Sequence, residues 1–296
     1  MRNFRNCAPV FVFFCICVGN SPLPRQTVLN VWPDMALAET TASTGNKLPP
    51  RDTDRPTITR VEGITQPTIQ VFPAAEPCGT AVLILPGGGF RYVVPDLEGS
   101  EAAAYLNDLG ITAFVLNYRT TNGPDPRPWY RPLQDSQRAI RLIRGEAKRW
   151  KIDPEQVGLF GFSAGGQVAA IHLTDAEVHY SNIDDVDGLS AKPDFGVLIY
   201  PWNIYDADND RLIDPVRIDQ HTPKTFLVHT HDDRSSSLGA VLFYTGLKRL
   251  SIASELHVYQ NGGHGYGTRA REGSVIGTWK ERMADWLQIN GLSHQK

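Results

Sequence analysis

Residues 157–174 read VGLFGFSAGGQVAAIHLT, an apolar run that passes through a glycine-rich turn into a helical pattern. The run 157–162 predicts a buried strand, and residues 165–173 predict a helix. In the turn between them, Gly161-Phe162-Ser163-Ala164-Gly165, small residues let the strand and the helix approach closely and expose the Ser163 side chain. A turn without chemical function is the alternative, but the strand-to-helix context favours a nucleophilic serine.

Strand-like and helix-like segments alternate on both sides of this turn. The predicted strands are 68–72, 81–85, 111–118, 157–162, 195–200, 225–230 and 254–260, and the predicted helices are 98–109, 132–150, 165–173, 238–250 and 275–289. This alternation is typical of an α/β fold with helices on both faces of a mostly parallel sheet. Ligands of such sheets bind beyond the carboxyl ends of the strands, so functional residues are expected in the loops that follow them.

The overall composition is that of an ordinary globular protein. The chain has 296 residues, of which 41% are hydrophobic and 21% charged, and its formal net charge is −3. This length suits one large α/β domain. No run of Lys or Arg stands out, so no nucleic-acid partner is expected. Asp206, Asp208 and Asp210 have the opening spacing of a calcium loop, but Arg211 replaces the glycine that such loops need. Neither a metal ion nor a cofactor is therefore expected, and the oligomeric state is left open.

The N-terminal region differs from the rest of the chain. Arg2 and Arg5 precede the apolar run 7–19, CAPVFVFFCICVG. This run is short for a membrane span and fits the apolar core of a secretory signal. We expect residues 1–38 to form a leader, cleaved near residue 19 or at 36–38, that exports the protein to the periplasm or exterior and leaves no stable membrane span. An uncleaved anchor and a misplaced start codon are the alternatives. Residues 39–57 are expected to form a flexible linker, and 58–296 the functional domain.

A second glycine-rich loop, Pro86-Gly87-Gly88-Gly89-Phe90, follows the predicted strand 81–85. Backbone N–H groups in such a loop can stabilise the negative charge that develops on a carbonyl oxygen during acyl transfer. We assign this oxyanion-hole function to Gly88 and Gly89 together with Ala164. A phosphate-binding loop would need Lys followed by Ser or Thr after the glycines, and Phe90-Arg91 does not match.

The candidate base and acid follow two later strands. His264 lies in the loop Gly262–Gly267 after the predicted strand 254–260, where it can act as a general base for Ser163. Asp232 and Asp233 follow the strand 225–230, and either carboxylate could orient the histidine. The chain order serine, aspartate, histidine is the order expected for this strand–turn–helix motif. The predicted catalytic residues are Ser163 and His264, with either Asp233 or Asp232 as the acid.

These motifs resemble the α/β-hydrolase superfamily, and most of all its small serine esterases that include bacterial acetyl-xylan and feruloyl esterases. The similar stretches include LILPGGGF (83–90), IDPEQVGLFGFSAGG (152–166), HTHDD (229–233) and ELHVYQNGGHGYG (255–267). The resemblance implies a catalytic domain over 58–296 that cleaves short-chain acyl esters, with acetyl esters of xylan or a related carbohydrate as substrates, through an acyl-enzyme. The family often places its acid four residues after a histidine, which favours Asp233. Pro86 and Thr230 depart from the family pattern.

Several assignments stay open. A serine peptidase or another hydrolase on the same fold is the alternative function, because a fold alone does not determine the reaction. Trp202 and Tyr130 flank predicted elements near the expected active face, where they are predicted to contact the substrate; packing of the pocket wall is the alternative. Cys78 is the single cysteine beyond the leader, so no intramolecular disulfide is expected in the mature chain.

Overall fold

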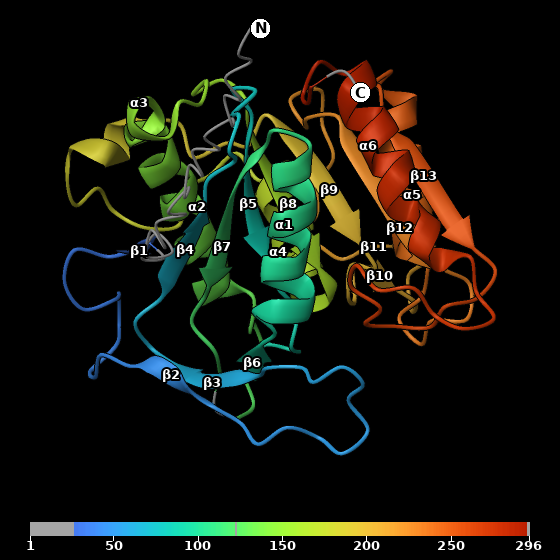
Figure 1. Ribbon diagram of the computed structural model, residues 1–296, viewed down its shortest axis with the longest axis horizontal. Coiled ribbons are helices and arrows are strands. Elements are labelled where there is room, and N and C mark those ends of the chain that lie inside the picture. Colours follow the sequence, from blue (N-terminus) through green and yellow to red (C-terminus); the bar gives the residue numbers. More distant parts are fainter. Residues whose placement is uncertain (1–26, 122, 295–296) are drawn as a thin grey trace, which may run out of the picture.

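The computed structural model describes residues 27–121 and 123–294. Its centre is an eight-stranded sheet in the order β1-β4-β7-β5-β8-β9-β12-β13 (Figure 1). The strands are β1 Thr27–Asn30, β4 Thr68–Phe72, β5 Ala81–Leu85, β7 Thr112–Asn117, β8 Val157–Phe162, β9 Phe195–Ile199, β12 Thr225–Thr230 and β13 Glu255–Tyr259. From β7 to β13 in this order, neighbouring strands pair in parallel, whereas β4 pairs antiparallel with both of its neighbours, β1 and β7. The predicted mostly parallel sheet is confirmed.

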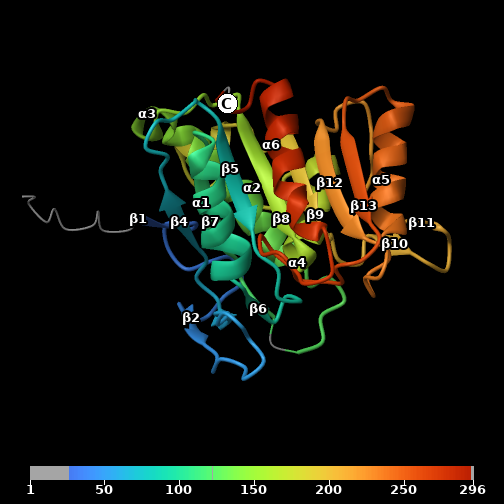
Figure 2. The ribbon, with the colours of Figure 1, turned by 45° about the vertical axis from the view of Figure 1, so that its right-hand side comes forward.

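Helices cover both faces of the sheet, as predicted. They are α1 Glu101–Asp108, α2 Tyr130–Gly145, α3 Ala147–Trp150, α4 Ser163–Thr174, α5 Leu238–Arg249 and α6 Trp279–Ile289. Figures 1 and 2 show α1 and α6 on one face and α2 and α4 on the other. Each strand of the middle of the sheet is therefore buried on both sides: in β5, Leu83 packs into one core and Val82 into the other. This is why these strands are continuous apolar runs in the sequence.

Three of the predicted helices contain an interruption or a first turn of a different kind in the structure. The helix predicted over 132–150 starts at Tyr130 and is interrupted at Glu146, whose φ of −98° and ψ of 12° leave the helical region. The first turn of the helix predicted over 98–109 is a π-helical turn, Asp96–Ser100. The helix predicted from 275 begins with a 3₁₀ turn, Ile276–Thr278. The remaining short elements are β6 Tyr92–Val93, β10 Tyr205–Asp206, β11 Arg211–Leu212 and a 3₁₀ turn, Asp185–Gly188.

The N-terminal segment from residue 27 onward belongs to the folded domain, which corrects the expectation of a flexible linker over 39–57. β1 adds an edge strand to the main sheet, with Thr27 opposite Val71. β2 (Thr44–Lys47) lies within the predicted linker and pairs with β3 (Val61–Ile64), which in turn pairs with β6. These ladders satisfy backbone groups that a linker would expose to water. The apolar run 7–19 and a cleavage site near it lie outside the described residues.

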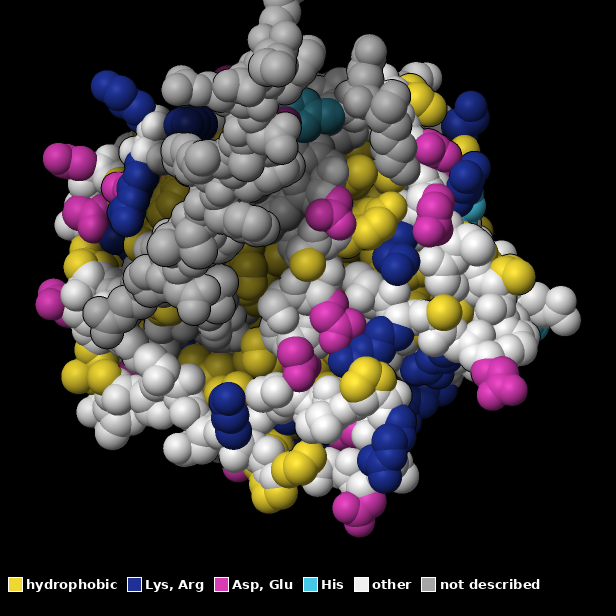
Figure 3. Space-filling model, viewed as in Figure 1, with side chains coloured by type: hydrophobic (Ala, Val, Ile, Leu, Met, Phe, Trp, Pro, Cys, Tyr) yellow, Lys and Arg dark blue, Asp and Glu magenta, His cyan; other side chains and the backbone are white. Residues whose placement is uncertain are grey.

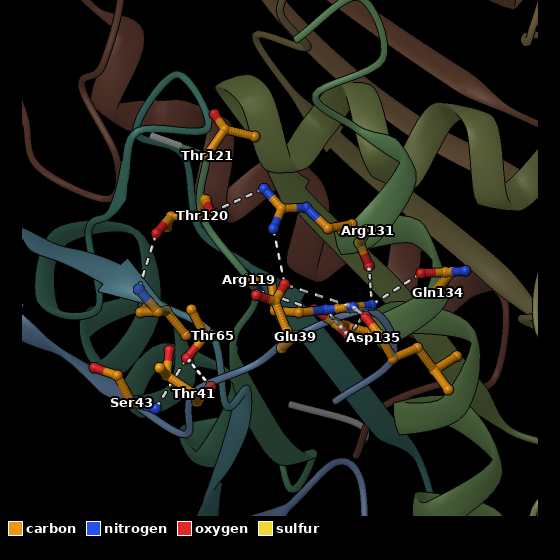
Figure 4. Close-up of polar contacts among 12 residues, drawn as sticks. Glu39, Thr41, Ser43, Thr65, Arg119, Thr120, Thr121, Arg131, Gln134 and Asp135 are labelled. Atoms are coloured by element: carbon orange, nitrogen blue, oxygen red, sulfur yellow. Dashed lines mark hydrogen bonds and ion pairs between the residues drawn. The ribbon is translucent and has the colours of Figure 1, made fainter. Parts of the chain in front are cut away.

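A buried polar network holds this segment against the domain (Figure 4). Arg119, which follows β7, is completely buried; its Nε donates to Asp135 Oδ1 at 2.9 Å and its Nη1 donates to the Leu37 carbonyl oxygen at 2.6 Å. The same carboxylate accepts a hydrogen bond from the indole N–H of Trp32 at 2.8 Å. Glu39 pairs with Arg131 at 2.8 Å. A buried charge needs such partners, so the N-terminal segment completes a network that the domain would otherwise leave unsatisfied.

Candidate active site

Ser163 lies at the point where β8 turns into α4. Its φ of +50° falls in the left-handed region, which is uncommon for a residue with a side chain. The turn requires glycine at position 165, where a Cβ would collide with the carbonyl oxygen of Leu85. Strain of this kind costs about 1–3 kcal/mol and is characteristic of functional sites. The turn therefore has the geometry that the sequence motif implied.

His264 lies between Ser163 and Asp233. The Nε2 atom of His264 is 2.7 Å from Ser163 Oγ, and its Nδ1 atom is 2.7 Å from Asp233 Oδ2. The Asp233 side chain is fully buried, and its other oxygen accepts a hydrogen bond from the Ser235 N–H at 2.8 Å. Parallel pairing explains how these residues meet: β12 and β13 end side by side, with Thr230 opposite Tyr259. The loops after both strands thus emerge at the same edge of the sheet as Ser163.

The structure gives the two adjacent aspartates different positions. The Asp232 carboxylate accepts hydrogen bonds from the backbone N–H groups of Gly263, at 2.8 Å, and Gly262, at 3.2 Å. These bonds hold the pKa of Asp232 below its ordinary value, with the Gly263 N–H as the largest cause. Asp232 therefore braces the loop that carries the histidine, whereas Asp233 contacts the histidine ring itself.

The glycine loop after β5 lies beside Ser163 because Leu85 is paired with Gly161. Gly88 and Gly89 have φ values of +137° and +62° and line the same cavity as Ser163 and His264. Within the described part of the chain, their N–H groups donate no hydrogen bond. Ala164 occupies the first turn of α4, where backbone N–H groups have no partner inside the helix. The three assigned positions thus offer backbone donors next to the Ser163 side chain.

Glu98 is a component of the site that the sequence analysis did not identify. It is only 4% exposed, and Oε2 accepts the Gly87 N–H at 2.7 Å while Oε1 accepts the Tyr200 hydroxyl at 2.7 Å. The Tyr200 oxygen in turn accepts the Gly267 N–H at 2.9 Å. Burial raises the pKa of Glu98, an effect that these hydrogen bonds oppose. Glu98 and Tyr200 thereby connect the glycine loop to the histidine loop. In the sequence Glu98 resembles an ordinary acidic residue at a helix start.

A cavity of about 400 Å³ opens above Ser163. Trp202, one of the two predicted substrate-contacting residues, lines it and packs edge-on against the His264 ring with a centroid distance of 5.2 Å. Tyr130 does not line it, which corrects that prediction. The Tyr130 ring instead packs against His179, at 5.5 Å, and beneath the Arg127 guanidinium. The reason is that Tyr130 begins α2, whose first turn faces the segment that follows α4.

Residues 27–121 and 123–294 contain no group of three or more His, Cys, Asp or Glu side chains that could hold a metal ion. Over the same ranges, no helix combines the length and apolar character needed to cross a bilayer. Cys78 carries a free, partly exposed thiol.

Among curated proteins, relatives of this chain include enzymes with xylan-related names. An acetylxylan esterase of Xylanibacter ruminicola is 28% identical over 244 residues, which cover 74% of this chain and 46% of that protein. The endo-1,4-beta-xylanase B of Butyrivibrio fibrisolvens is 29% identical over 206 residues, covering 62% and 32%. The chain thus spans less than half the length of these two relatives.

Solved structures and a family model agree with the observed fold. The acetyl ester-xyloside bifunctional hydrolase from Caldicellulosiruptor lactoaceticus matches with a TM-score of 0.69 and 28% identity, covering 92% of this chain and 99% of that one. The α/β hydrolase MGS-M1 from a Medee basin deep-sea metagenome library matches with a TM-score of 0.60 and 22% identity, covering 90% and 98%. Residues 74–195 match the family model described as BD-FAE. These matches agree with an α/β-hydrolase fold for this chain, whose residues 74–195 are similar to the BD-FAE family.

Proposed function

We propose that this protein is a serine hydrolase that cleaves short-chain carboxylic esters, with acetyl esters of xylan or a related carbohydrate as its substrates. The observation that carries the proposal is the continuous array of Ser163 Oγ, His264 and Asp233, joined by two 2.7 Å contacts beside the glycine loop that contains Gly88 and Gly89. The names of the acetylxylan esterase relative and of the acetyl ester-xyloside hydrolase support the ester and the carbohydrate parts of the proposal.

The geometry supports a two-step reaction. His264 takes the proton of the Ser163 hydroxyl through Nε2, and Oγ attacks the ester carbonyl carbon. Asp233 holds the imidazole ring and stabilises the imidazolium ion that forms. The N–H groups of Gly88, Gly89 and Ala164 receive the negative charge of the tetrahedral intermediate. His264 returns the proton to the departing alcohol, which leaves an acyl-enzyme. Water, deprotonated by the same histidine, then attacks the acyl carbon and releases the acid and free Ser163.

We also propose that the N-terminal region exports the protein to the periplasm or exterior. The basic start and the apolar run 7–19 are the features that support this. A cut at 36–38 would remove β1 and the buried Trp32 side chain, which argues for cleavage on the N-terminal side of Thr27. Amino-terminal sequencing of the protein recovered from the medium or periplasm tests this. A first residue beyond Thr27 would contradict the proposed cleavage site, and recovery only from the cytoplasm would contradict export.

The activity is tested with the full chain on p-nitrophenyl acetate, butyrate and octanoate, methyl ferulate, acetylated xylan and a peptide panel. Ser163→Ala is expected to lower kcat by about 10⁴-fold or more, and Asp233→Asn by a similar order, because each removes part of a unit that acts together. Asp232→Asn is the matched control and should cost less than about tenfold, since it only braces the loop. Hydrolysis retained in Ser163→Ala refutes the mechanism. Cleavage of peptides but not esters would instead favour a serine peptidase.

A further inference from the structure

Arginine side chains surround the cavity above Ser163. Four of them line it: Arg51, Arg60, Arg91 and Arg234. The single carboxylate among the lining residues is Glu98, which is buried and already accepts the Gly87 N–H and the Tyr200 hydroxyl. The mouth of the cavity therefore carries an excess of positive charge, although the chain as a whole has a net charge of −3.

Only one of the four arginines is neutralised by a carboxylate. Arg60 forms a two-point contact with Asp54, at 2.7 and 3.1 Å, and both side chains are largely buried, so this pair braces the wall. Arg51, Arg91 and Arg234 are exposed, and none of them forms an ion pair with a described residue. Arg51 makes one long contact, 3.4 Å, to the Tyr92 hydroxyl.

The three unpaired arginines come from separate parts of the chain and meet at the site. Arg51 belongs to the N-terminal segment, Arg91 follows the glycine loop, and Arg234 comes directly after Asp233. The Arg234 guanidinium lies over the Trp202 ring, 5.4 Å from its centroid, which holds it beside His264. Figure 3 shows Lys and Arg side chains gathered at the lower right of the view, where Figure 1 draws the loop between β2 and β3 beneath the loops that follow the strands.

We infer that the preferred substrate carries an anionic group close to the acyl ester, as an acylated sugar chain does when its rings bear uronic-acid carboxylates or sulfate groups. Guanidinium groups bind carboxylate and sulfate oxygens through paired hydrogen bonds. A cleft with one sign of charge also raises the local concentration of oppositely charged ligands. The inference rests on the proposed ester hydrolysis and specifies the substrate class of that same site.

Matched sugar esters test the inference. Three methyl glycosides carry one acetyl group at the same hydroxyl and differ only at C6: glucoside with a hydroxymethyl group, glucuronide with a carboxylate, and glucoside 6-sulfate. At low ionic strength we expect kcat/KM for at least one anionic ester to exceed that of the neutral ester by about tenfold, mainly through KM. Salt at about 0.5 M should remove most of this advantage by screening. Comparison of kcat/KM for the glucuronide and for the glucoside 6-sulfate shows which anionic group of the substrate the site prefers.

Variants that remove one positive charge test whether the arginines that line the cavity cause the preference for anionic esters. Arg91→Gln and Arg234→Gln should each lower the anionic-to-neutral ratio of kcat/KM by about three- to tenfold, because each removes one unpaired guanidinium group from the cavity mouth. Arg149→Gln is the matched control: Arg149 is also exposed, but it lies on α3 and pairs with Glu146 at 3.1 Å. Its ratio should equal that of the wild type.

The assays distinguish failure of this inference from failure of the proposed function. If p-nitrophenyl acetate and the neutral and anionic sugar esters are all hydrolysed, with equal kcat/KM for the sugars, the inference is overturned and the proposed function stands. If no ester is hydrolysed, the proposed function fails, and calorimetric titration of folded Ser163→Ala with the glucuronide and the glucoside decides the inference. Tighter binding of the glucuronide supports a cationic recognition site, whereas equal or no binding overturns it.

Discussion

Replacing Glu98 with alanine should displace the glycine loop beside Ser163 without touching the three residues of the proposed triad. The Glu98 carboxylate accepts the Gly87 N–H and the Tyr200 hydroxyl, both at 2.7 Å, and is 4% exposed. Alanine leaves both donors buried and unpaired. Each unpaired donor costs about 1–3 kcal/mol, so the free energy of unfolding should fall by roughly 2–6 kcal/mol. At about 2–4 °C for each kcal/mol, Tm should drop by roughly 4–24 °C.

The loss of activity follows from the position of the loop. Gly87 directly precedes Gly88 and Gly89, so a shift of its backbone moves the N–H groups that are proposed to bind the oxyanion. Removing one oxyanion donor costs about 10²–10³-fold in kcat, and we expect a loss of about 10²-fold for Glu98→Ala. KM should change little, because such contacts strengthen mainly in the transition state. Glu98→Gln keeps one acceptor oxygen and should lose less than about tenfold.

Steady-state hydrolysis of p-nitrophenyl acetate, measured below the Tm of each variant, provides the assay. Glu146→Ala is the control, because the Glu146 side chain is 43% exposed and pairs with Arg149 on the surface. If Glu98→Ala folds, as judged by circular dichroism, and retains kcat within twofold of the wild type, Glu98 does not position the loop. A loss confined to KM would contradict the same reasoning.

Two further predictions concern stability. Trp32→Ala should lower the free energy of unfolding by about 3–5 kcal/mol in urea titrations, because the ring is 1% exposed and its N–H donates a hydrogen bond to Asp135. The control Val28→Ala, on the exposed side of β1, should lower it by less than about 0.5 kcal/mol. Equally small effects of both substitutions would mean that the N-terminal segment is not part of the domain. Burial lowers the pKa of His172 from 6.5 to about 4, so at intermediate pH the unfolded chain binds a proton that the folded chain does not. The free energy of unfolding should therefore fall as the pH drops from about 6.5 toward 4, and His172 should account for roughly 2–3 kcal/mol of this loss at pH 4.5. Urea titrations at pH 7.5 and 4.5 should show a loss smaller by that amount in His172→Gln than in the wild type. An equal loss in both proteins would contradict the lowered pKa of His172.

The sequence alone predicted most strands and helices of this protein, because these elements depend on local residue patterns. The apolar runs of the parallel strands and the three- and four-residue spacing of the helices depend on neighbours within a few residues, and the strands observed between β4 and β13 in the main sheet match the predicted ranges to within one residue at each end. The turn at Ser163 and the loops at Gly88 and His264 were also predictable from local sequence. A backbone position that needs close approach or positive φ favours glycine, and the glycines are visible in the sequence.

Other features depend on residues far apart in the chain, and only the tertiary structure decided them. Asp232 and Asp233 have the same chemistry, and the β12–β13 register places one on the histidine loop and the other on the histidine ring. Arg119 and Asp135 bind Leu37 and Trp32, partners 82 and 103 positions away in the predicted leader. The predicted linker is likewise part of the domain, because its strand β2 pairs with β3. Glu98 and the unpaired arginines carry no local signature. Their effect arises from burial and from shared charge at one cavity, and both are properties of the folded chain.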